Sequence, residues 1–394
     1  MGRAEMKIQN EENRTGSIPC GELPKSSHGY RFRKLLVVHT FIFVLFLNHF
    51  SQSISIEDSD APFEVGFRTR LTSDTSRSFK FISRTRAVGR PIRLFIWYPA
   101  RKSKPARFLV FADYVYSQSL EKEMRQLTSA EKSNFDKKLA ETLEFFNVGA
   151  EQVKDLMKAE TKASRNALEI KGNFPLVVLG NVGEGFYYSS LAEYLAANGY
   201  VVVTMPSVGA NEGERCGFDL NCLKIQQTDM EFAIARMSKQ PNVDASRIGL
   251  IAWSFSGLAA AHLQTRNPNV KAVVSLDAAT GYQYGKEILD LSREYDVNKT
   301  NIPFLHLHGL AGQSRVAKNF DFFNTYQSKR KKLLEFRNLQ HSDFISLFGI
   351  GVRYAKKENN EMTTSEIRQA NLAIKEFLNA YLKKSPRKLK RKGV

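Results

Sequence analysis

The sequence lacks several features that would place it in common functional classes. Its Gly-rich segment, residues 180–185, has no lysine of the P-loop pattern G-x-x-x-x-G-K-[ST], which argues against nucleotide binding. The formal net charge is +18, but no nucleic-acid recognition motif accompanies it, so no specific nucleic-acid partner is expected. The sequence also implies neither a metal ion nor an organic cofactor.

Long apolar runs are scarce as well. The run Leu35–Leu47 has 13 residues behind a basic cluster, whereas a membrane span needs about 20. This is the size of a signal-peptide core, and Ser51-Gln-Ser53 is a candidate cleavage site. We expect residues 1–53 to be a leader and the body of the chain to be exported, either secreted or periplasmic. An uncleaved signal anchor that holds the protein at a membrane is the alternative.

Cysteine is scarce, with three residues in the chain. Cys20 precedes the apolar run and would be removed with the leader. Five residues separate the remaining pair, Cys216 and Cys222, and this spacing permits a local disulfide in an oxidising compartment. Two reduced cysteines in a loop are the alternative.

Apolar and aromatic residues are plentiful. They make up 42% and 11% of the chain, enough for a large core, which excludes general disorder. One domain, residues 54–382, accounts for this material. Within it, residues 117–169 carry apolar side chains at helical spacing and predict a helical hairpin. This insertion is either a cap over a site or a peripheral layer on the sheet.

The C-terminal segment, residues 383–394, is strongly basic. Seven of its residues are Lys or Arg. Such a run cannot bury itself, so we expect a flexible tail. Its candidate partners are an anionic membrane surface or an acidic polysaccharide, and a solvated tail that aids solubility is the alternative.

The most informative segment is Arg247–Ala261, which leads from an apolar strand through Ser254 into a helix of small residues. This arrangement is typical of a nucleophile elbow, a strained turn that exposes a serine hydroxyl above a sheet. The usual motif is G-x-S-x-G, but here Ala252 and Ser256 flank the serine, followed by Gly257. A plain strand-to-helix turn is the alternative interpretation.

A serine hydroxyl needs a positioned base, and a histidine is the usual one. His341 lies in a polar loop after a strand-like run, from which it can reach back over the sheet. His306 and His308 share one face of the apolar run Ile302–Gly309, so we expect both to be packed and hydrogen-bonded. His262 falls on the helix after the elbow and points away from the turn.

The best candidate for the acid is Asp277, at the C-terminal end of an apolar strand, where catalytic groups of open α/β sheets gather. Many enzymes with such an elbow place the acid after the next strand. That stretch here, Gly309–Ala317, contains no carboxylate. Asp321 and Asp343 are the alternatives. The resulting order along the chain is nucleophile, acid and base, as in α/β-hydrolases.

With these motifs in order, the chain resembles the α/β-hydrolases of the dienelactone-hydrolase-like group. It is similar to the platelet-activating-factor acetylhydrolases in placing its acid on the strand directly after the elbow. Besides the elbow, the matching stretches are Arg90–Ala100, Phe174–Asn181, Leu191–Tyr200, Ser275–Asp277 and His341–Phe344. The resemblance implies an α/β-hydrolase fold, with a mostly parallel central sheet flanked by helices.

The resemblance also implies a function. We expect an exported serine hydrolase that cleaves carboxylic esters, with a short-chain acyl or lipid-type ester as its small-molecule substrate. Ser254 would attack, His341 would move the proton and Asp277 would orient the imidazole. The oxyanion would bind the backbone N–H of Phe255 and a loop N–H of Asn181 or Val182. The alternative is a binding protein that keeps the fold without the chemistry.

Overall fold

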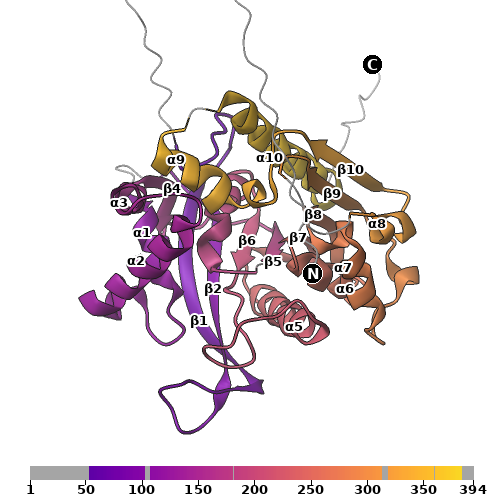
Figure 1. Ribbon diagram of the computed structural model, residues 1–394, viewed down its shortest axis with the longest axis horizontal. Coiled ribbons are helices and arrows are strands. Elements are labelled where there is room, and N and C mark those ends of the chain that lie inside the picture. The colour runs from indigo at the N-terminus through magenta and orange to yellow at the C-terminus, as the bar shows by residue number, and fades with distance from the viewer. Residues whose placement is uncertain (1–52, 103–106, 181, 313–317, 359, 384–394) are drawn as a thin grey trace, which may run out of the picture. The chain divides into compact units, whose positions relative to one another are not determined.

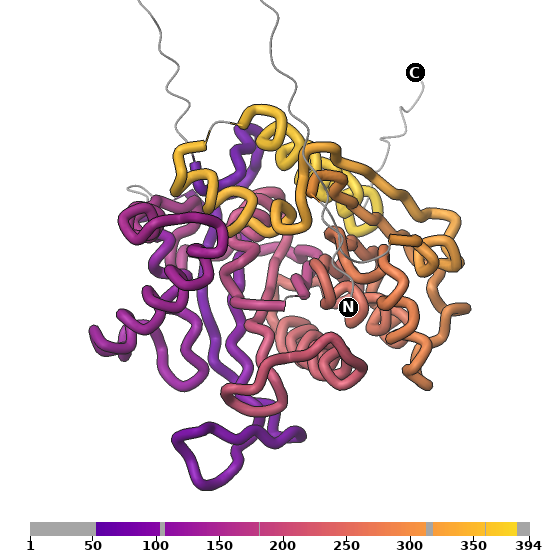
Figure 2. Tube along the Cα trace, in the orientation of Figure 1, coloured from indigo at the N-terminus to yellow at the C-terminus, as the bar shows by residue number. Residues whose placement is uncertain are grey.

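A mixed sheet organises the chain. The computed structural model describes residues 53–102, 107–180, 182–312, 318–358 and 360–383. The predicted leader up to residue 52 and the predicted tail from residue 384 therefore lie outside the described residues. Figure 1 labels most strands of the sheet, and Figure 2 traces the same chain, coloured by residue number. The sheet has the strand order β10-β9-β8-β7-β5-β6-β2-β1-β4-β3. Its strands are β1 (Glu64–Phe79), β2 (Val88–Ala100), β3 (Phe108–Val110), β4 (Glu160–Arg165), β5 (Phe174–Gly180), β6 (Val201–Thr204), β7 (Val243–Trp253), β8 (Val270–Leu276), β9 (Phe304–Gly309) and β10 (Lys331–Phe336).

The strands from β6 to β10 in this order are all parallel, whereas β2 pairs antiparallel with both β6 and β1. The parallel strands are almost continuously apolar because both faces of the sheet are covered. In β5, Val177 and Leu179 enter one core and Leu176 and Val178 enter the other. The carboxyl ends of these strands meet at one edge, where the predicted site residues lie.

Helices cover both faces of the sheet. Residues of α4 and α10 belong to one core and residues of α5 and α6 to the other (Figure 1). Within the described part of the chain, no helix combines the length and the apolar character that a membrane span requires. The helices are α1 (Phe111–Val115), α2 (Ser129–Glu144), α3 (Ala150–Lys158), α4 (Ser189–Ala197), α5 (Leu220–Met237), α6 (Ser256–Leu263), α7 (Gln283–Asp290), α8 (Asp321–Thr325), α9 (Val352–Lys356) and α10 (Glu361–Leu382).

The insertion contains two helices, α2 and α3, at the positions of the predicted hairpin, but its C-terminal end forms a strand that the sequence does not predict. There β4 joins the sheet, parallel to β1 and antiparallel to β3. Its alternating burial, with Thr161 and Ala163 inside, rests on small and polar residues and gives a weak strand pattern. Leu143 and Leu156 of the hairpin are buried in the same core as α4 and α10, and α3 packs against α1 and α9. The hairpin's connection also carries Phe146 onto Phe348, with stacked rings 4.7 Å apart.

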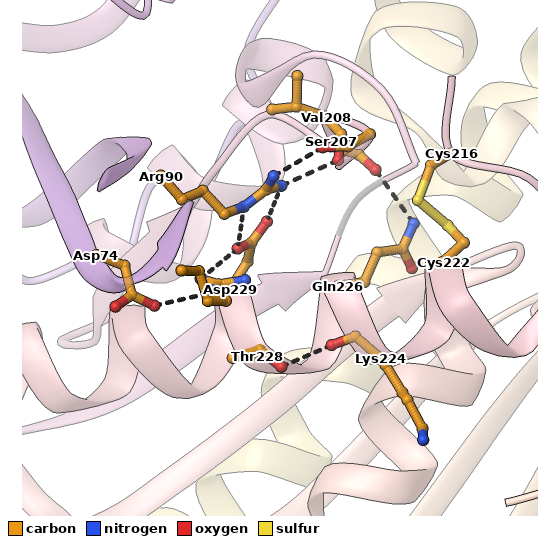
Figure 3. A network of polar contacts seen from close by, with 12 residues as sticks. Asp74, Arg90, Ser207, Val208, Cys216, Cys222, Lys224, Gln226, Thr228 and Asp229 are labelled. Atoms are coloured by element: carbon orange, nitrogen blue, oxygen red, sulfur yellow. Dashed lines mark hydrogen bonds and ion pairs between the residues drawn. A yellow bond between two sulfur atoms is a disulfide. The ribbon is translucent and has the colours of Figure 1, made fainter. Parts of the chain in front are cut away.

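A buried ion pair fixes the loop that joins β6 to α5 (Figure 3). The guanidinium of Arg90 donates from Nε and Nη2 to the two carboxylate oxygens of Asp229, each at 2.8 Å. It also donates to the backbone carbonyls of Val208 and Gly209. Arg77 adds a second ion pair to Asp229 at 2.8 Å. The guanidinium of Arg90 on β2 therefore connects this loop to the middle of α5.

The predicted disulfide between Cys216 and Cys222 is confirmed, and it fixes the far end of the same loop (Figure 3). Cys222 is buried on α5 and Cys216 lies in the loop. Phe218, between the two cysteines, packs edge-on against Phe255, with ring centroids 5.4 Å apart. The disulfide therefore closes a short loop that holds Phe218 against Phe255, the residue after Ser254.

We expect Asp229→Leu to lower the free energy of unfolding by about 3–5 kcal/mol, because it leaves buried guanidinium charge without its carboxylate. Urea denaturation of the two proteins measures the difference. The matched control is Lys299→Met, which breaks the pair with Asp296 at 3.7 Å; both side chains are exposed, at 64% and 39%. That control should leave the stability unchanged. Equal losses in both variants would contradict a structural role for the buried pair.

Candidate active site

The turn at Ser254 has the backbone of a nucleophile elbow. β7 ends at Trp253 and α6 begins at Ser256. Ser254 between them has φ +56°, a left-handed conformation that costs a non-glycine residue about 1–3 kcal/mol and is concentrated at functional sites. The turn leaves Ser254 half-buried, in the wall of a cavity.

The two departures from G-x-S-x-G have local compensations. Ala252 lies beside Gly180 of β5 in the sheet register, and a methyl group added at Gly180 would come 3.3 Å from the Ala252 methyl. Because residue 180 is a glycine, β5 leaves room for the methyl group of Ala252. The hydroxyl of Ser256 donates to the carbonyl of Trp253 at 2.7 Å. This serine therefore closes the turn with its own hydrogen bond.

The structure brings Asp277 and His341 together. Asp277 follows β8, and His341 opens a 3₁₀ turn, His341–Phe344, after β10. Nδ1 of His341 donates to Oδ2 of Asp277 at 2.8 Å. The carboxylate is buried, whereas the imidazole is 42% exposed. Burial alone would raise the pKa of the Asp277 carboxyl, but hydrogen bonds from His308 and His341 outweigh it and hold this pKa well below its ordinary value.

Trp253 makes two contacts with His341. Its ring stacks on the ring of His341 with centroids 4.7 Å apart. Its indole N–H donates to the carbonyl of His341 at 2.8 Å. The residue before the nucleophile therefore orients the candidate base through both its ring and its N–H group.

The alternative acids bind elsewhere. Asp321 is exposed and accepts a hydrogen bond from the amide of Asn319. Asp343 accepts from the backbone N–H of Gln340 and from Arg353. Neither contact involves an imidazole, so Asp277 is the carboxylate that the described residues place against His341.

A cavity of about 540 Å³ opens at this edge of the sheet, lined by Ser254, Asp277 and His341. Aromatic rings form much of the remaining wall: Phe218, Tyr282 and Tyr284. The volume lies in the range of small-molecule sites. The three predicted residues therefore share one cavity that is large enough for a small ester.

Two of the predicted oxyanion donors, Phe255 and Val182, follow the ends of the neighbouring strands β7 and β5. Phe255 occupies the N-cap position of α6, directly after Ser254. Val182 lies in the loop after β5, whereas Asn181 lies outside the described residues. The hydroxyl of Tyr188 donates to the carbonyl of Gly180 at 2.8 Å and accepts the N–H of Trp253 at 3.1 Å. One tyrosine thus connects the end of β5 to the elbow.

A second group of polar residues surrounds Asp277. Ligand atoms of Asp277, His306 and His308 lie within 4.8 Å of one another, and all three residues are buried. Burial lowers the pKa of His306 to about 3, so this imidazole is neutral. Both oxygens of Asp277 already accept hydrogen bonds from imidazoles, and Nε2 of His308 faces the ammonium of Lys318 at 3.3 Å. With these lone pairs engaged, the group does not fit a metal site.

Sequence reasoning missed several residues that complete the site. Trp253, Tyr188 and Phe218 act through contacts between segments far apart in the chain, and their positions in the sequence give no signal of these contacts. His306 is packed and hydrogen-bonded as expected, with Nδ1 2.8 Å from the hydroxyl of Ser275. His262 lies on α6, and its Nε2 is 2.9 Å from the hydroxyl of Ser292.

Comparison with known proteins identifies the fold. No protein-family model and no curated protein sequence matches the chain. A ferulic acid esterase from Streptomyces cinnamoneus has a similar structure, with a TM-score of 0.57 and 17% identity over 87% of this chain and 96% of that one. A Bacteroides ovatus protein described as a dipeptidyl aminopeptidase IV gives a TM-score of 0.44 and 13% identity, over 82% of this chain and 37% of that one. The first similarity and the sheet confirm the predicted α/β-hydrolase fold.

Proposed function

We propose that the chain is a serine hydrolase that cleaves carboxylic esters through an acyl-enzyme. One observation carries the proposal. The imidazole of His341 donates to the buried carboxylate of Asp277 and lines the same cavity as Ser254, whose backbone is left-handed. This geometry supports the assignment of Ser254 as nucleophile, His341 as base and Asp277 as orienting acid.

In the acylation step, Oγ of Ser254 attacks the carbonyl carbon of the ester while Nε2 of His341 takes the hydroxyl proton. Asp277 keeps the other ring proton on Nδ1, so Nε2 is free to accept. The negative oxygen of the tetrahedral intermediate would bind the N–H groups of Phe255 and Val182. The bond from carbon to the alcohol oxygen then breaks, and His341 returns the proton to the departing alcohol.

Deacylation repeats these steps with water. Nε2 of His341 takes a proton from a water molecule, whose oxygen attacks the acyl carbon. The bond to Oγ breaks, His341 returns the proton to Ser254, and the carboxylic acid leaves. The resemblance to dienelactone-hydrolase-like enzymes and platelet-activating-factor acetylhydrolases supports the position of the acid after β8.

The cavity suggests the substrate class. Phe218, Tyr282 and Tyr284 offer aromatic surface beside Ser254, which favours an apolar or aromatic group on one side of the ester. A cavity of about 540 Å³ suits a small acyl group better than a long lipid chain. Because the structural neighbour is a ferulic acid esterase, we choose esters of ferulic acid as probes, beside short aliphatic esters.

We further propose that the protein acts outside the reducing cytosol. The disulfide of Cys216 and Cys222 supports this, because such bonds persist in oxidising compartments. The predicted leader points the same way, and a signal anchor remains the alternative. The basic C-terminal segment, seven Lys or Arg residues between 383 and 392, would then be available to anionic surfaces.

Turnover of p-nitrophenyl esters of graded acyl length, together with methyl ferulate, tests the proposal. The enzyme hypothesis predicts saturable hydrolysis, with the highest kcat/KM among small or aromatic acyl groups. The binding-protein hypothesis predicts no hydrolysis of any ester by well-folded protein. Circular dichroism on the same sample shows whether the protein is folded.

A further inference from the structure

The carboxylate of Asp277 holds two imidazoles, not one. Nδ1 of His308 lies 2.7 Å from Oδ1, and Nδ1 of His341 lies 2.8 Å from Oδ2. His308 and Asp277 are almost completely buried, with side-chain exposures of 3% and 2%. Because a carboxylate accepts and does not donate, both Nδ1 atoms carry the proton.

Lys318 faces Nε2, the other nitrogen of the His308 ring. Its ammonium lies 3.3 Å from Nε2 of His308 and donates to the carbonyl of Gly309 at 3.1 Å. An ammonium has hydrogen-bond donors only, so Nε2 of His308 must be the acceptor. The two partners thus hold His308 in its neutral form with the proton on Nδ1.

The sheet positions this pair. β8 and β9 are parallel, with Leu276 beside Leu307, and the backbone N–H of Asp277 donates to the carbonyl of Leu307 at 2.7 Å. His308 is the next residue of β9 and therefore lies against Asp277 at the ends of the two strands. His306, two residues earlier on the same face, bonds instead to the hydroxyl of Ser275 at 2.8 Å.

The two hydrogen bonds from His308 and His341 restrict rotation of the Asp277 carboxylate. A carboxylate with one imidazole partner can turn about its Cβ–Cγ bond and lose alignment with it. In this protein the second oxygen is held as well, by Nδ1 of His308 and more weakly by the N–H of Gly309 at 3.4 Å. Both oxygens are therefore fixed before a substrate enters.

We propose that His308, held by Lys318, is a positioning residue that aligns Asp277 with His341 in the hydrolytic reaction. This inference rests on the proposed function for its kinetic effect. His308 does not touch the reacting atoms and acts only through the carboxylate. Its loss should therefore lower kcat and leave KM nearly unchanged, because substrate contacts remain.

Three variants test the kinetic effect. We expect His308→Leu to lower kcat by about 10- to 100-fold, the usual loss when a supporting hydrogen bond to the active site is removed. His308→Asn keeps an N–H donor near the position of Nδ1 and should recover most of kcat. The matched control is His306→Leu, which removes a buried imidazole from the same strand face and spares both contacts to Asp277. Equal kcat values for the Leu and Asn variants of His308, or an equal loss in His306→Leu, would overturn the proposal.

NMR of ¹⁵N-histidine-labelled wild-type protein tests the geometry independently of turnover. We expect His308 to show a protonated Nδ1 and an unprotonated Nε2, with a downfield Nδ1 proton that Asp277→Asn shifts. A proton on Nε2 of His308 would overturn the proposal. If the wild-type protein cleaved no ester while this tautomer was present, the proposed function would fail and the hydrogen bond would stand.

Discussion

Ser254→Ala is expected to lower kcat for ester hydrolysis by about 10⁶-fold, as loss of the nucleophile does in serine hydrolases with a triad. The variant removes the only atom that forms the acyl bond, and the remaining oxyanion donors support only weak catalysis by water. The fold should be unaffected, because the cavity wall loses a single half-buried hydroxyl. Steady-state kinetics on the best ester of the panel measures the loss.

Ser256→Ala is the matched control for this prediction. It also removes a serine hydroxyl, two residues after Ser254. This hydroxyl donates to the carbonyl of Trp253 at 2.7 Å. We expect a loss in kcat of less than about tenfold, equivalent to one neutral hydrogen bond. A larger loss of kcat in Ser256→Ala than in Ser254→Ala would contradict the assignment of Ser254 as the nucleophile.

Asp277→Asn is expected to lower kcat by about 10⁴-fold with little change in KM. The amide presents one oxygen and one NH₂ group to the two imidazoles, where the carboxylate presents two acceptors. An NH₂ group opposite His341 favours the tautomer with the proton on Nε2, which cannot take the proton of Ser254. The same kinetic assay, with KM and kcat determined separately, measures the effect.

Asp321→Asn and Asp343→Asn are the controls, because these residues are the alternative acids that the sequence leaves open. Their carboxylates bind Asn319 in one case and Gln340 and Arg353 in the other. Both variants should keep kcat within a few fold of the wild-type value. A 10⁴-fold loss in either one, with Asp277→Asn active, would contradict the assignment of the acid.

The elements that the sequence predicts best are those with strong local patterns. The apolar runs of β5, β7 and β8 are buried on both faces, and their ends carry Ser254 and Asp277 to the edge where such groups gather. The order of nucleophile, acid and base follows from these strands. The degenerate elbow is different, because its two compensations come from the neighbouring Gly180 and from the hydroxyl of Ser256. Only the folded chain brings Gly180 beside Ala252.

The contacts that sequence reasoning misses depend on the register between strands. His308 is buried as predicted, but its bond to Asp277 requires that β8 and β9 end together. Trp253 likewise reads as a strand residue, and its stacking on His341 joins residues 88 positions apart. β4 is missed because its inward residues are small or polar. Tertiary packing, not local pattern, decides the contacts of His308 and Trp253.

Covalent labelling with a fluorophosphonate, followed by peptide mapping, tests the central claim most directly. A fluorophosphonate reacts preferentially with a serine that a positioned base activates. We predict stoichiometric modification of the peptide that contains Ser254, abolished in Ser254→Ala and strongly slowed in His341→Ala. A folded wild-type protein that stays unmodified, or one modified at a serine other than Ser254, would contradict the account.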